Sequence, residues 1–598
     1  MATKKRILII GGGFAGITAI KSLKEEGLEP VCYEASDAIG GTWRYRDEAS
    51  LGSPSIMPTT TINQSKEMGA VSDWMPDKAL PNYMKHSQLL TVFLQYAEHF
   101  DCCRHVTCRR KVLKVVRSND YDETGKWCAV VQNMETSQIV TDTFDGVIVA
   151  VGQFGYPKMA HYPGLDEFKG IKMHTHELKH VDIFKGKNVL IIGAGCSGLD
   201  AAVDISNVSK QVYLSTRSGV WIIPRVGPYG LPLDFCYLRR IWWSLFTLLG
   251  HNVGSRFLEE KELNRKFNHN LYNIRPTYRV LSKDPSVNDI IPSRILTKSV
   301  IVQRDVKYFT DSGVAFEDDS KVYDIDAVIM ATGYHLEFPF LEDDIFVNKN
   351  GRIELYKCVY PPKLKHPTLA IVALVLPFGP GFPLGEMQLR WISRVFSEKC
   401  KLPTKEIMMQ SIEKRHEENV KRYVQSDKMS IRVDYIDYLD ELAVEIGVKP
   451  NFWNLLFTDP KLFKALIFGP SVPYQYRLIG PHKWDGARNA ILTTYDRVRY
   501  PLSSGKRKPL KKTHSANKLI KYLVAILLFL VFFNSGGYLL RYCILLLIAL
   551  YIKSMHSFGW KYFLHVLLLP FYVPWNGFVP SFFVILFVPF ILATIPKS

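Results

Sequence analysis

The stretch that decides the fold of this chain is Ile7-Leu8-Ile9-Ile10-Gly11-Gly12-Gly13-Phe14-Ala15-Gly16. An apolar run typical of a buried strand leads here into a G-x-G-x-x-G fingerprint that opens a helix-like segment. A second stretch repeats the arrangement, with Val189–Ile192 followed by Gly193-Ala194-Gly195-Cys196-Ser197-Gly198. In this setting the glycines predict a dinucleotide whose pyrophosphate lies at a helix N-terminus. Two such stretches predict two dinucleotides bound at once, with electrons passing from one to the other.

The first site carries an acid where the ribose of its ligand is expected. Glu34 ends the predicted strand Pro30–Glu34, 23 residues after Gly11. A carboxylate there accepts hydrogen bonds from ribose hydroxyls and repels a 2′-phosphate, so FAD or NAD fits and NADP does not. We favour FAD, because a fingerprint this close to the N-terminus is common in flavoproteins. Gly40-Gly41-Thr42-Trp43 adds a glycine pair that lets backbone lie against a cofactor, although a plain loop is an equal interpretation.

The second site lacks that acid. The same count from Gly193 reaches Thr216, and Arg217 follows it at the end of the predicted strand Val212–Thr216. A guanidinium presents a fork of donors suited to a 2′-phosphate, which indicates NADPH. The alternative is that Arg217 is only a solvated charge at a strand end.

Composition excludes several other classes. The 598-residue chain has a formal net charge of +18, but it contains no zinc-finger spacing and no aromatic RNA-binding motif, so nucleic acid is not an expected partner. Part of the excess charge, at 506–508 and 511–512, directly precedes an apolar tail and favours a membrane surface. None of the ten cysteines forms a C-x-x-C pair, which argues against a zinc site and against a disulfide reductase.

The order of these patterns predicts an α/β chain with two Rossmann-like dinucleotide-binding domains. We expect the FAD domain in residues 1–155 and 331–505, with the NADP domain, residues 156–330, inserted into it. Apolar strands predicted within 144–152 and 325–334 mark the two crossings. Within the inserted domain, residues 221–300 are expected to face a membrane. Their segment Tyr237–Phe246 places paired arginines beside tryptophans, which suits either a membrane interface or burial against the protein.

The C-terminal composition predicts a basic linker at 506–518 and a membrane-embedded region at 519–598. A spanning helix needs about 20 apolar residues. The run 578–595 nearly meets this length, whereas the earlier runs are short or interrupted. The number of crossings therefore stays open, and the basic linker is expected on the cytosolic side.

The motifs taken in order resemble the flavin-containing monooxygenases, the membrane-bound class of animals. The resemblance covers about residues 4–500 and is closest to the vertebrate type with Baeyer–Villiger activity. Besides the two fingerprints it rests on Gly40–Trp43, Ile62–Met68, Phe168–His174, Ala331–Tyr334 and Lys483–Arg488. Two features depart from the family pattern. Leu178 stands before Lys179 where an aromatic residue is usual, and the apolar tail is longer than a single anchor.

The resemblance implies that NADPH reduces FAD and that the reduced flavin captures dioxygen as a C4a-(hydro)peroxide. The oxygen then passes to a soft nitrogen or sulfur nucleophile of a small molecule, or in Baeyer–Villiger mode to a ketone. Asn63 is expected beside the reacting flavin, since a carboxamide both donates and accepts without titrating; a turn-capping asparagine is the alternative. His174 is expected to make structural hydrogen bonds. Lys66 and Glu67 are interpreted as a surface pair with no catalytic role.

The cofactor contacts implied by the resemblance fall into two sets. The expected FAD contacts are Gly11, Gly12, Gly13, Phe14, Ala15, Gly16, Glu34, Gly41, Thr42, Trp43, Asn63 and Gln64. The expected NADP contacts are Ile62, Asn63, Gly193, Gly195, Ser197, Gly198, Leu199, Asp200, Thr216 and Arg217. The resemblance also implies an endoplasmic reticulum membrane location with the catalytic part facing the cytosol, and it leaves room for a homo-oligomer. Two other functions stay open on the same scaffold: an uncoupled NADPH oxidase that releases hydrogen peroxide, and a catalytically silent nucleotide-binding protein.

Overall fold

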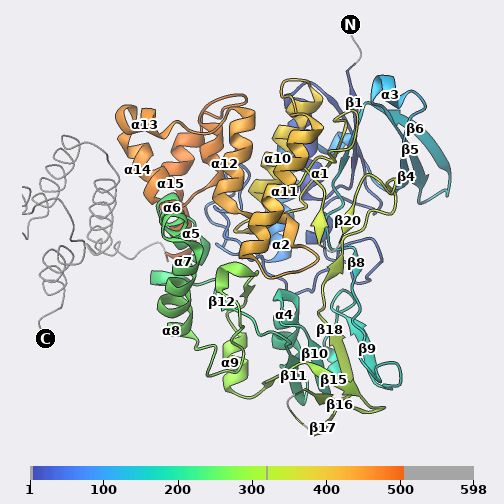
Figure 1. Ribbon diagram of the computed structural model, residues 1–598, viewed down its shortest axis with the longest axis vertical. Coiled ribbons are helices and arrows are strands. Elements are labelled where there is room, and N and C mark those ends of the chain that lie inside the picture. The colour runs from blue at the N-terminus through green and yellow to red at the C-terminus, as the bar shows by residue number, and fades with distance from the viewer. Residues whose placement is uncertain (1–3, 318, 320, 350, 504–598) are drawn as a thin grey trace, which may run out of the picture. The chain divides into compact units, whose positions relative to one another are not determined.

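The computed structural model describes residues 4–503 except 318, 320 and 350, and two parallel sheets organise it (Figure 1). The first sheet has the strand order β22-β7-β1-β2-β3. Its strands are β1 (Arg6–Ile10), β2 (Glu29–Tyr33), β3 (Val106–Thr107), β7 (Gly146–Val149) and β22 (Leu369–Ile371). Strands β1, β7 and β22 are buried along nearly their whole length, which is why they read as continuous apolar runs.

Helices cover this first sheet, and a smaller sheet joins two of its strands. Helix α1 (Phe14–Glu25) follows β1 directly and packs against α10 (Phe382–Phe396). The antiparallel sheet of β4 (Arg110–Arg117), β5 (Trp127–Asn133) and β6 (Ile139–Phe144) lies between β3 and β7 in the chain. The remaining elements of this part are α2 (His86–His99), α3 (Tyr121–Thr124), β20 (Asn348–Lys349) and β21 (Arg352–Ile353).

The second parallel sheet has the order β14-β11-β10-β18-β9. Its strands are β9 (Ile171–His174), β10 (Asn188–Ile192), β11 (Gln211–Ser215), β14 (Val300–Gln303) and β18 (Ala327–Met330). Helices α4 (Cys196–Ile205) and α9 (Ile291–Leu296) pack beside them, and β15 (Val306–Phe309), β16 (Gly313–Phe316) and β17 (Val322–Asp324) form an antiparallel sheet. The strands predicted beside both fingerprints and at both crossings are confirmed.

The chain enters and leaves the second sheet through a short antiparallel pair. Strand β8 (Tyr156–Pro157) pairs with β19 (Tyr334–His335), one on each side of the second sheet in sequence. Strand β22 then pairs in parallel with β7, so the chain returns to the first sheet after completing the second. The predicted boundaries at residues 155, 330 and 505 stay predictions.

A helical segment stands between β11 and β14. It contains β12 (Ile222–Ile223), α5 (Leu233–Tyr237), α6 (Arg240–Leu249), α7 (His251–Phe257), a π-helical turn (Leu258–Leu263), α8 (Asn264–Lys266) and β13 (Ser286–Val287). For Tyr237–Phe246 the structure supports burial at three positions: Arg240, Trp243 and Phe246 lie in the interior. Arg240 donates both Nη atoms to the carboxylate of Asp440 at 2.7 Å, which fixes α6 to the C-terminal helices.

The C-terminal helices complete the described part of the chain. They are α11 (Lys405–Arg422), α12 (Tyr435–Ile446), α13 (Phe452–Thr458), α14 (Pro460–Phe468) and α15 (Ala487–Arg499). Between α11 and α12, β24 (Arg432–Asp434) pairs with β23 (Leu376–Phe378). Across residues 4–503 no helix combines the length and the apolar character needed to cross a bilayer. The predicted basic linker 506–518 and membrane region 519–598 lie outside the described residues.

Candidate active site

The first fingerprint forms a turn that only glycine allows. Gly11 has φ +106°, and a Cβ there would lie 2.9 Å from the carbonyl oxygen of Ala150. A Cβ on Gly16 would lie 1.9 Å from the carbonyl oxygen of Gly11, so glycine lets α1 start tightly against β1. The turn therefore leaves the N-terminus of α1 free to receive a pyrophosphate.

Glu34 holds a fixed carboxylate beside this turn. Its Oε2 accepts a hydrogen bond from the Gly12 N–H at 2.6 Å, and its Oε1 accepts from the Ser36 N–H at 2.8 Å and the Ser36 hydroxyl at 2.6 Å. These bonds orient the carboxylate at the end of β2, where an adenosine ribose would extend from the pyrophosphate. The negative charge at this point fits a ribose with free hydroxyls and opposes a 2′-phosphate.

The Gly40–Trp43 segment packs over the first fingerprint, so the cofactor-facing interpretation is favoured over a plain loop. The Gly40 N–H donates to the Gly12 carbonyl at 3.0 Å, and a Cβ on Gly41, which has φ +54°, would lie 2.9 Å from the Gly13 Cα. Trp43 closes the far side, with its ring 5.9 Å from that of Phe382 in an edge-on arrangement. Phe14 contacts the same Phe382 ring, with the ring centroids 4.3 Å apart and the planes tilted.

Two glycines of the second fingerprint have the same backbone conformation and the same close carbonyl contacts as their counterparts in the first. Gly193 has φ +107°, and a Cβ on it would lie 2.6 Å from the Ala331 carbonyl oxygen, while a Cβ on Gly198 would lie 2.0 Å from the Gly193 carbonyl oxygen. Around Gly195, in contrast, no heavy atom of the described residues lies within 4 Å of the position a Cβ would take, apart from atoms of Gly195 and its chain neighbours. Leu199, a residue of α4, is fully buried in the hydrophobic core. Its side chain packs the helix onto the sheet and is not available to contact a cofactor.

Thr216 and Arg217 stand at the carboxyl end of β11, as predicted. Thr216 is buried and its N–H donates to the Gln303 carbonyl at 3.0 Å, whereas Arg217 is exposed. Lys283, which sequence reasoning missed, lies within reach of the Arg217 charge: burial lowers the pKa of Lys283, and the charges of Arg217 and Arg432 lower it further. The ammonium of Lys283 lies over the ring of Tyr278, 5.2 Å from its centroid. This end of the second sheet therefore carries a cluster of cations suited to a phosphate.

One large cavity brings residues of both sites together. Its volume is about 730 Å³. Of the residues predicted to bind cofactor, seven line it: Thr42, Trp43, Ile62, Asn63, Gln64, Ser197 and Asp200. The helical segment between β11 and β14 supplies much of the remaining wall, including Arg225, Leu233, Tyr237 and Trp243. The other predicted cofactor contacts, among them the fingerprint glycines, Glu34, Thr216 and Arg217, are not part of its lining.

Arg225 orients Asn63, the predicted catalytic residue. No feature of the sequence had indicated this role for Arg225. Arg225 Nη2 donates to Asn63 Oδ1 at 2.7 Å and to the Thr61 carbonyl at 3.2 Å, and its Nε donates to the Ile62 carbonyl at 3.3 Å. Asp289 fixes the arginine in turn, with Oδ2 3.2 Å from Nη1 and Oδ1 accepting from the Arg225 N–H at 2.8 Å. Because Oδ1 of Asn63 is engaged, its Nδ2 is left to donate into the cavity.

Two further cavity residues are held by local hydrogen bonds. Gln64 Oε1 accepts from the Gly381 N–H at 3.0 Å, so the amide links the Ile62–Met68 segment to the start of α10. Asp200 Oδ1 accepts from Asn288 Nδ2 at 2.8 Å. Burial raises the pKa of Asp200 to about 6, which leaves it close to half-protonated in mildly acidic solution.

The interpretation of Lys66 and Glu67 as a surface pair is wrong, because both side chains are buried. Lys66 Nζ donates to the carbonyl oxygens of Lys78 at 2.6 Å and Leu80 at 2.7 Å. Glu67 accepts from the Tyr474 hydroxyl at 2.9 Å and from Arg497 Nε at 3.0 Å. Lys66 therefore ties the backbone that follows Asn63 to the loop at residues 77–80, and Glu67 ties it to C-terminal residues, so both support the site from behind.

His174 makes the structural hydrogen bond expected of it. It is buried at the end of β9, and its Nδ1 accepts from the His176 N–H at 3.0 Å. Burial and the neighbouring His176 lower the pKa of His174 to about 4. The imidazole is therefore neutral at physiological pH. It lies in the second sheet directly behind the cavity wall, with its ring 5.2 Å from that of Tyr334, which lines the cavity.

Comparison with known proteins gives a consistent result. A family model described as Flavin-binding monooxygenase-like matches residues 4–535. Human flavin-containing monooxygenase 5 is 43% identical over 531 residues, which cover 88% of this chain and 99% of that protein. The structure of S-allyl-L-cysteine S-oxygenase from Allium sativum aligns with a TM-score of 0.58 at 22% identity, covering 83% of this chain and 99% of that one. An oxidized steroid monooxygenase bound to NADP aligns with a TM-score of 0.54 at 16% identity, covering 74% and 97%.

Proposed function

The chain belongs to the flavin-binding monooxygenase-like family, and from this premise we propose which of its residues carry the reaction and on which substrates. It is a flavin monooxygenase that uses FAD, NADPH and dioxygen on a small-molecule substrate. Reduced by NADPH, the bound flavin supplies the activated oxygen. The chain's own residues bind and orient the two cofactors, exclude water and position the substrate.

FAD is assigned to the first fingerprint. Gly11, Gly13 and Gly16 leave the N-terminus of α1 open to the pyrophosphate, and Glu34 is set to accept from ribose hydroxyls. Phe14 and Trp43 supply apolar walls beside it through their contacts with Phe382. The remaining assigned contacts are Gly12, Ala15, Gly41, Thr42, Asn63 and Gln64.

NADPH is assigned to the second fingerprint, with the 2′-phosphate on Arg217. The open space at Gly195 admits the pyrophosphate, and Thr216 with Arg217 replaces the acid that the first site carries. Ile62, Asn63, Ser197 and Asp200 line the wall toward the nicotinamide end. Gly193, Gly198 and Leu199 contribute by shaping the turn and packing α4.

The observation that carries the proposal is the Asn63–Arg225 pair on the wall shared by both cofactor sites. Its 2.7 Å hydrogen bond fixes the carboxamide, so Asn63 Nδ2 donates into the cavity in one orientation at any pH at which the enzyme is folded. A fixed donor aimed at the oxygen being transferred costs no reorganisation during the reaction. We assign oxygenation of a nitrogen or sulfur nucleophile to this arrangement.

Ketone oxygenation is the second candidate, and the charge of Arg225 favours it. The arginine side chain is 13% exposed, so its cation is largely withdrawn from water beside the reacting groups. Attack on a carbonyl requires an anionic oxygen nucleophile, and a nearby guanidinium stabilises that charge, although Asp289 offsets part of it.

A stoichiometric assay tests both candidates. NADPH oxidation, hydrogen peroxide and product are measured with a tertiary amine, a thioether and a ketone of similar size. One product per NADPH with the amine or the thioether supports the first candidate, and coupling only with the ketone supports the second. Peroxide equal to NADPH with all three compounds contradicts both and indicates the oxidase; no NADPH oxidation at all indicates the silent nucleotide-binding protein.

We also propose an endoplasmic reticulum membrane location, with the lipid bilayer as partner and the catalytic part in the cytosol. The sequence supports it through the basic runs at 506–512 and the apolar tail that follows. The helical segment between β11 and β14 supports it as well, because Leu248 and Leu249 at the end of α6 are exposed. The homo-oligomer stays a prediction.

A further inference from the structure

Helix α13 displays large aromatic side chains that nothing in the described part of the chain covers. Trp453 and Phe457 are each 78% exposed, and no residue of this helix is buried. The two rings are one helical turn apart, so they project from the same face. Exposed side chains of this size are costly in water, which points to an apolar environment outside the fold.

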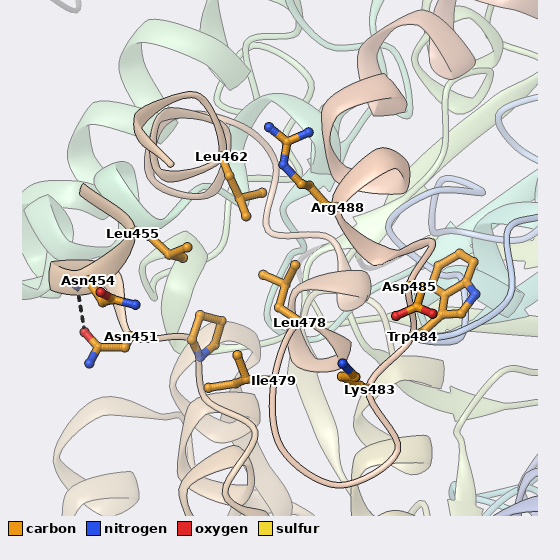
Figure 2. Close-up of a pocket in the computed structure, with 11 residues that line it drawn as sticks. Asn451, Asn454, Leu455, Leu462, Leu478, Ile479, Lys483, Trp484, Asp485 and Arg488 are labelled. Atoms are coloured by element: carbon orange, nitrogen blue, oxygen red, sulfur yellow. Dashed lines mark hydrogen bonds between the residues drawn. The ribbon is translucent and has the colours of Figure 1, made fainter. Parts of the chain in front are cut away.

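The opposite side of α13 faces the protein, where Phe452 and Leu455 pack against the hydrophobic core. Asn451, Asn454 and Leu455 also line a pocket of about 280 Å³ together with Leu462, Leu478 and Arg488 (Figure 2). The helix starts at a side-chain cap: Asn451 Oδ1 accepts from the Asn454 N–H at 3.0 Å, drawn as the dashed line in Figure 2. The local sequence thus fixes the helix start, while the aromatic pair is directed away from the protein.

The apolar surface continues onto the neighbouring helices and carries positive charge. Helix α14 packs against both α13 and α6, and Figure 1 shows them together on one side of the described chain. Phe463 and Ile467 on α14 are half-buried, Leu248 on α6 is exposed, and Lys461 and Lys464 stand exposed among them. Asp459, the acid at the start of α14, is occupied by Arg488 Nε at 2.6 Å.

The position of the apolar tail in the sequence indicates that this surface lies near a bilayer. Helix α15 packs against α14, and the described chain ends just after it, at Ser503. Residue 519, where the apolar tail begins, is sixteen positions after Ser503, and this stretch reaches at most about 55 Å when extended. A bilayer that holds the tail is therefore tethered within that distance of the end of α15, and the intervening chain contains the basic runs at 506–512.

We propose that the α13–α14 surface, formed by Trp453, Leu456, Phe457, Phe463, Ile467 and the lysines 461 and 464, lies in the headgroup region of an anionic lipid bilayer. Trp and Phe favour this depth, and lysines beside them attract anionic headgroups. This inference rests on the proposed membrane location and adds a second contact to it, outside both the tail and the segment 221–300. It turns one side of the catalytic part toward the lipid.

The test uses the full chain reconstituted in vesicles, with an environment-sensitive fluorescent amino acid at position 457. A matched control probe replaces Leu51, whose side chain is 77% exposed. This position lies near β8, because the N–H of the neighbouring Gly52 donates to the carbonyl of Gly155, and β8 is distant from α13 in Figure 1. The probe at 457 is expected to shift to the blue and to be quenched by lipids with a doxyl group near the glycerol more than by lipids labelled at the chain end. Quenching should increase with phosphatidylserine and return to its phosphatidylcholine level in the Lys461→Glu/Lys464→Glu variant.

The outcomes separate this inference from the proposed location. If the protein floats with the vesicles but the probe at 457 behaves like the probe at 51, the α13–α14 surface does not contact lipid and the inference is overturned. A blue shift that is insensitive to doxyl lipids and disappears when the protein is diluted in lipid identifies a second copy as the occupant, and also overturns it. A protein that does not float at all refutes the membrane location itself.

Discussion

Replacing Arg225 with methionine removes the guanidinium that orients Asn63 while keeping a side chain of similar length. The lost bond is charge-assisted and short at 2.7 Å; the arginine side chain is 13% exposed, whereas Asn63 itself is exposed. Such bonds contribute about 1.5–3 kcal/mol. At about 1.4 kcal/mol per factor of ten, kcat/KM for oxygenated product should fall about 10- to 150-fold. The share of NADPH that ends as hydrogen peroxide should rise, because a rotating carboxamide no longer holds the donor in place.

The assay measures product and peroxide side by side, together with the rate at which NADPH bleaches the flavin in the absence of oxygen. Arg225→Lys keeps a charge with a single point donor and should recover part of the loss. Arg256→Met, which changes an exposed arginine on α7, is the matched control and should leave all three quantities unchanged. Unaltered product and peroxide in Arg225→Met would refute the assignment of Asn63 as a residue positioned by Arg225.

Three further predictions follow from the two cofactor sites and their connection. Arg217→Ala should raise the KM for NADPH about 10- to 150-fold and that for NADH less than about twofold, because charge-assisted bonds to a 2′-phosphate contribute about 1.5–3 kcal/mol; equal effects in steady-state assays would rule out that contact. Gly198→Ala places a Cβ 2.0 Å from the Gly193 carbonyl oxygen and should abolish NADPH binding while the flavin absorbance is retained; loss of the flavin would contradict the assignment. The pKa of His174 is lowered to about 4, so the unfolded chain takes up the extra proton as pH falls from 6.5 to 4, and wild-type stability should decrease over that window. His174→Gln should make that decrease smaller by about 3 kcal/mol in urea unfolding, and an identical pH slope would contradict it.

The strands and turns of both dinucleotide sites follow from short stretches of sequence. Each apolar run leads into glycines that no other residue could replace, since a Cβ on Gly16 or Gly198 would overlap a carbonyl oxygen of its own turn. The ribose end is equally local, because Glu34 and Thr216 are placed by the next strand of the same unit. Residue type and spacing were sufficient to predict these features, because their geometry is set within about 25 residues of chain.

Contacts across the chain were not predictable in this way. Arg225 meets Asn63 across 162 residues, from a segment whose sequence indicated only a membrane or packing role. Lys66 and Glu67 look like surface residues because charged side chains are rarely buried unless paired. Their partners, the Leu80 carbonyl and Arg497, come from a loop and from the last described helix. No periodicity marks such pairs, because each partner is placed by the folding of a different element.

The two fingerprints also differ in a way that bears on how the cofactors are used. Gly13 in the first is covered by Gly41, whose Cα lies 3.5 Å from the position a Gly13 Cβ would take, and the Gly40 N–H ties this cover to the Gly12 carbonyl. In the second, Gly195 faces open space among the described residues. A ligand bound beneath such a cover would leave only when the cover moves, whereas an open fingerprint would exchange its ligand more readily. We therefore expect the first site to retain its dinucleotide and the second to exchange it, in keeping with the FAD and NADPH proposed for them from Glu34 and Arg217.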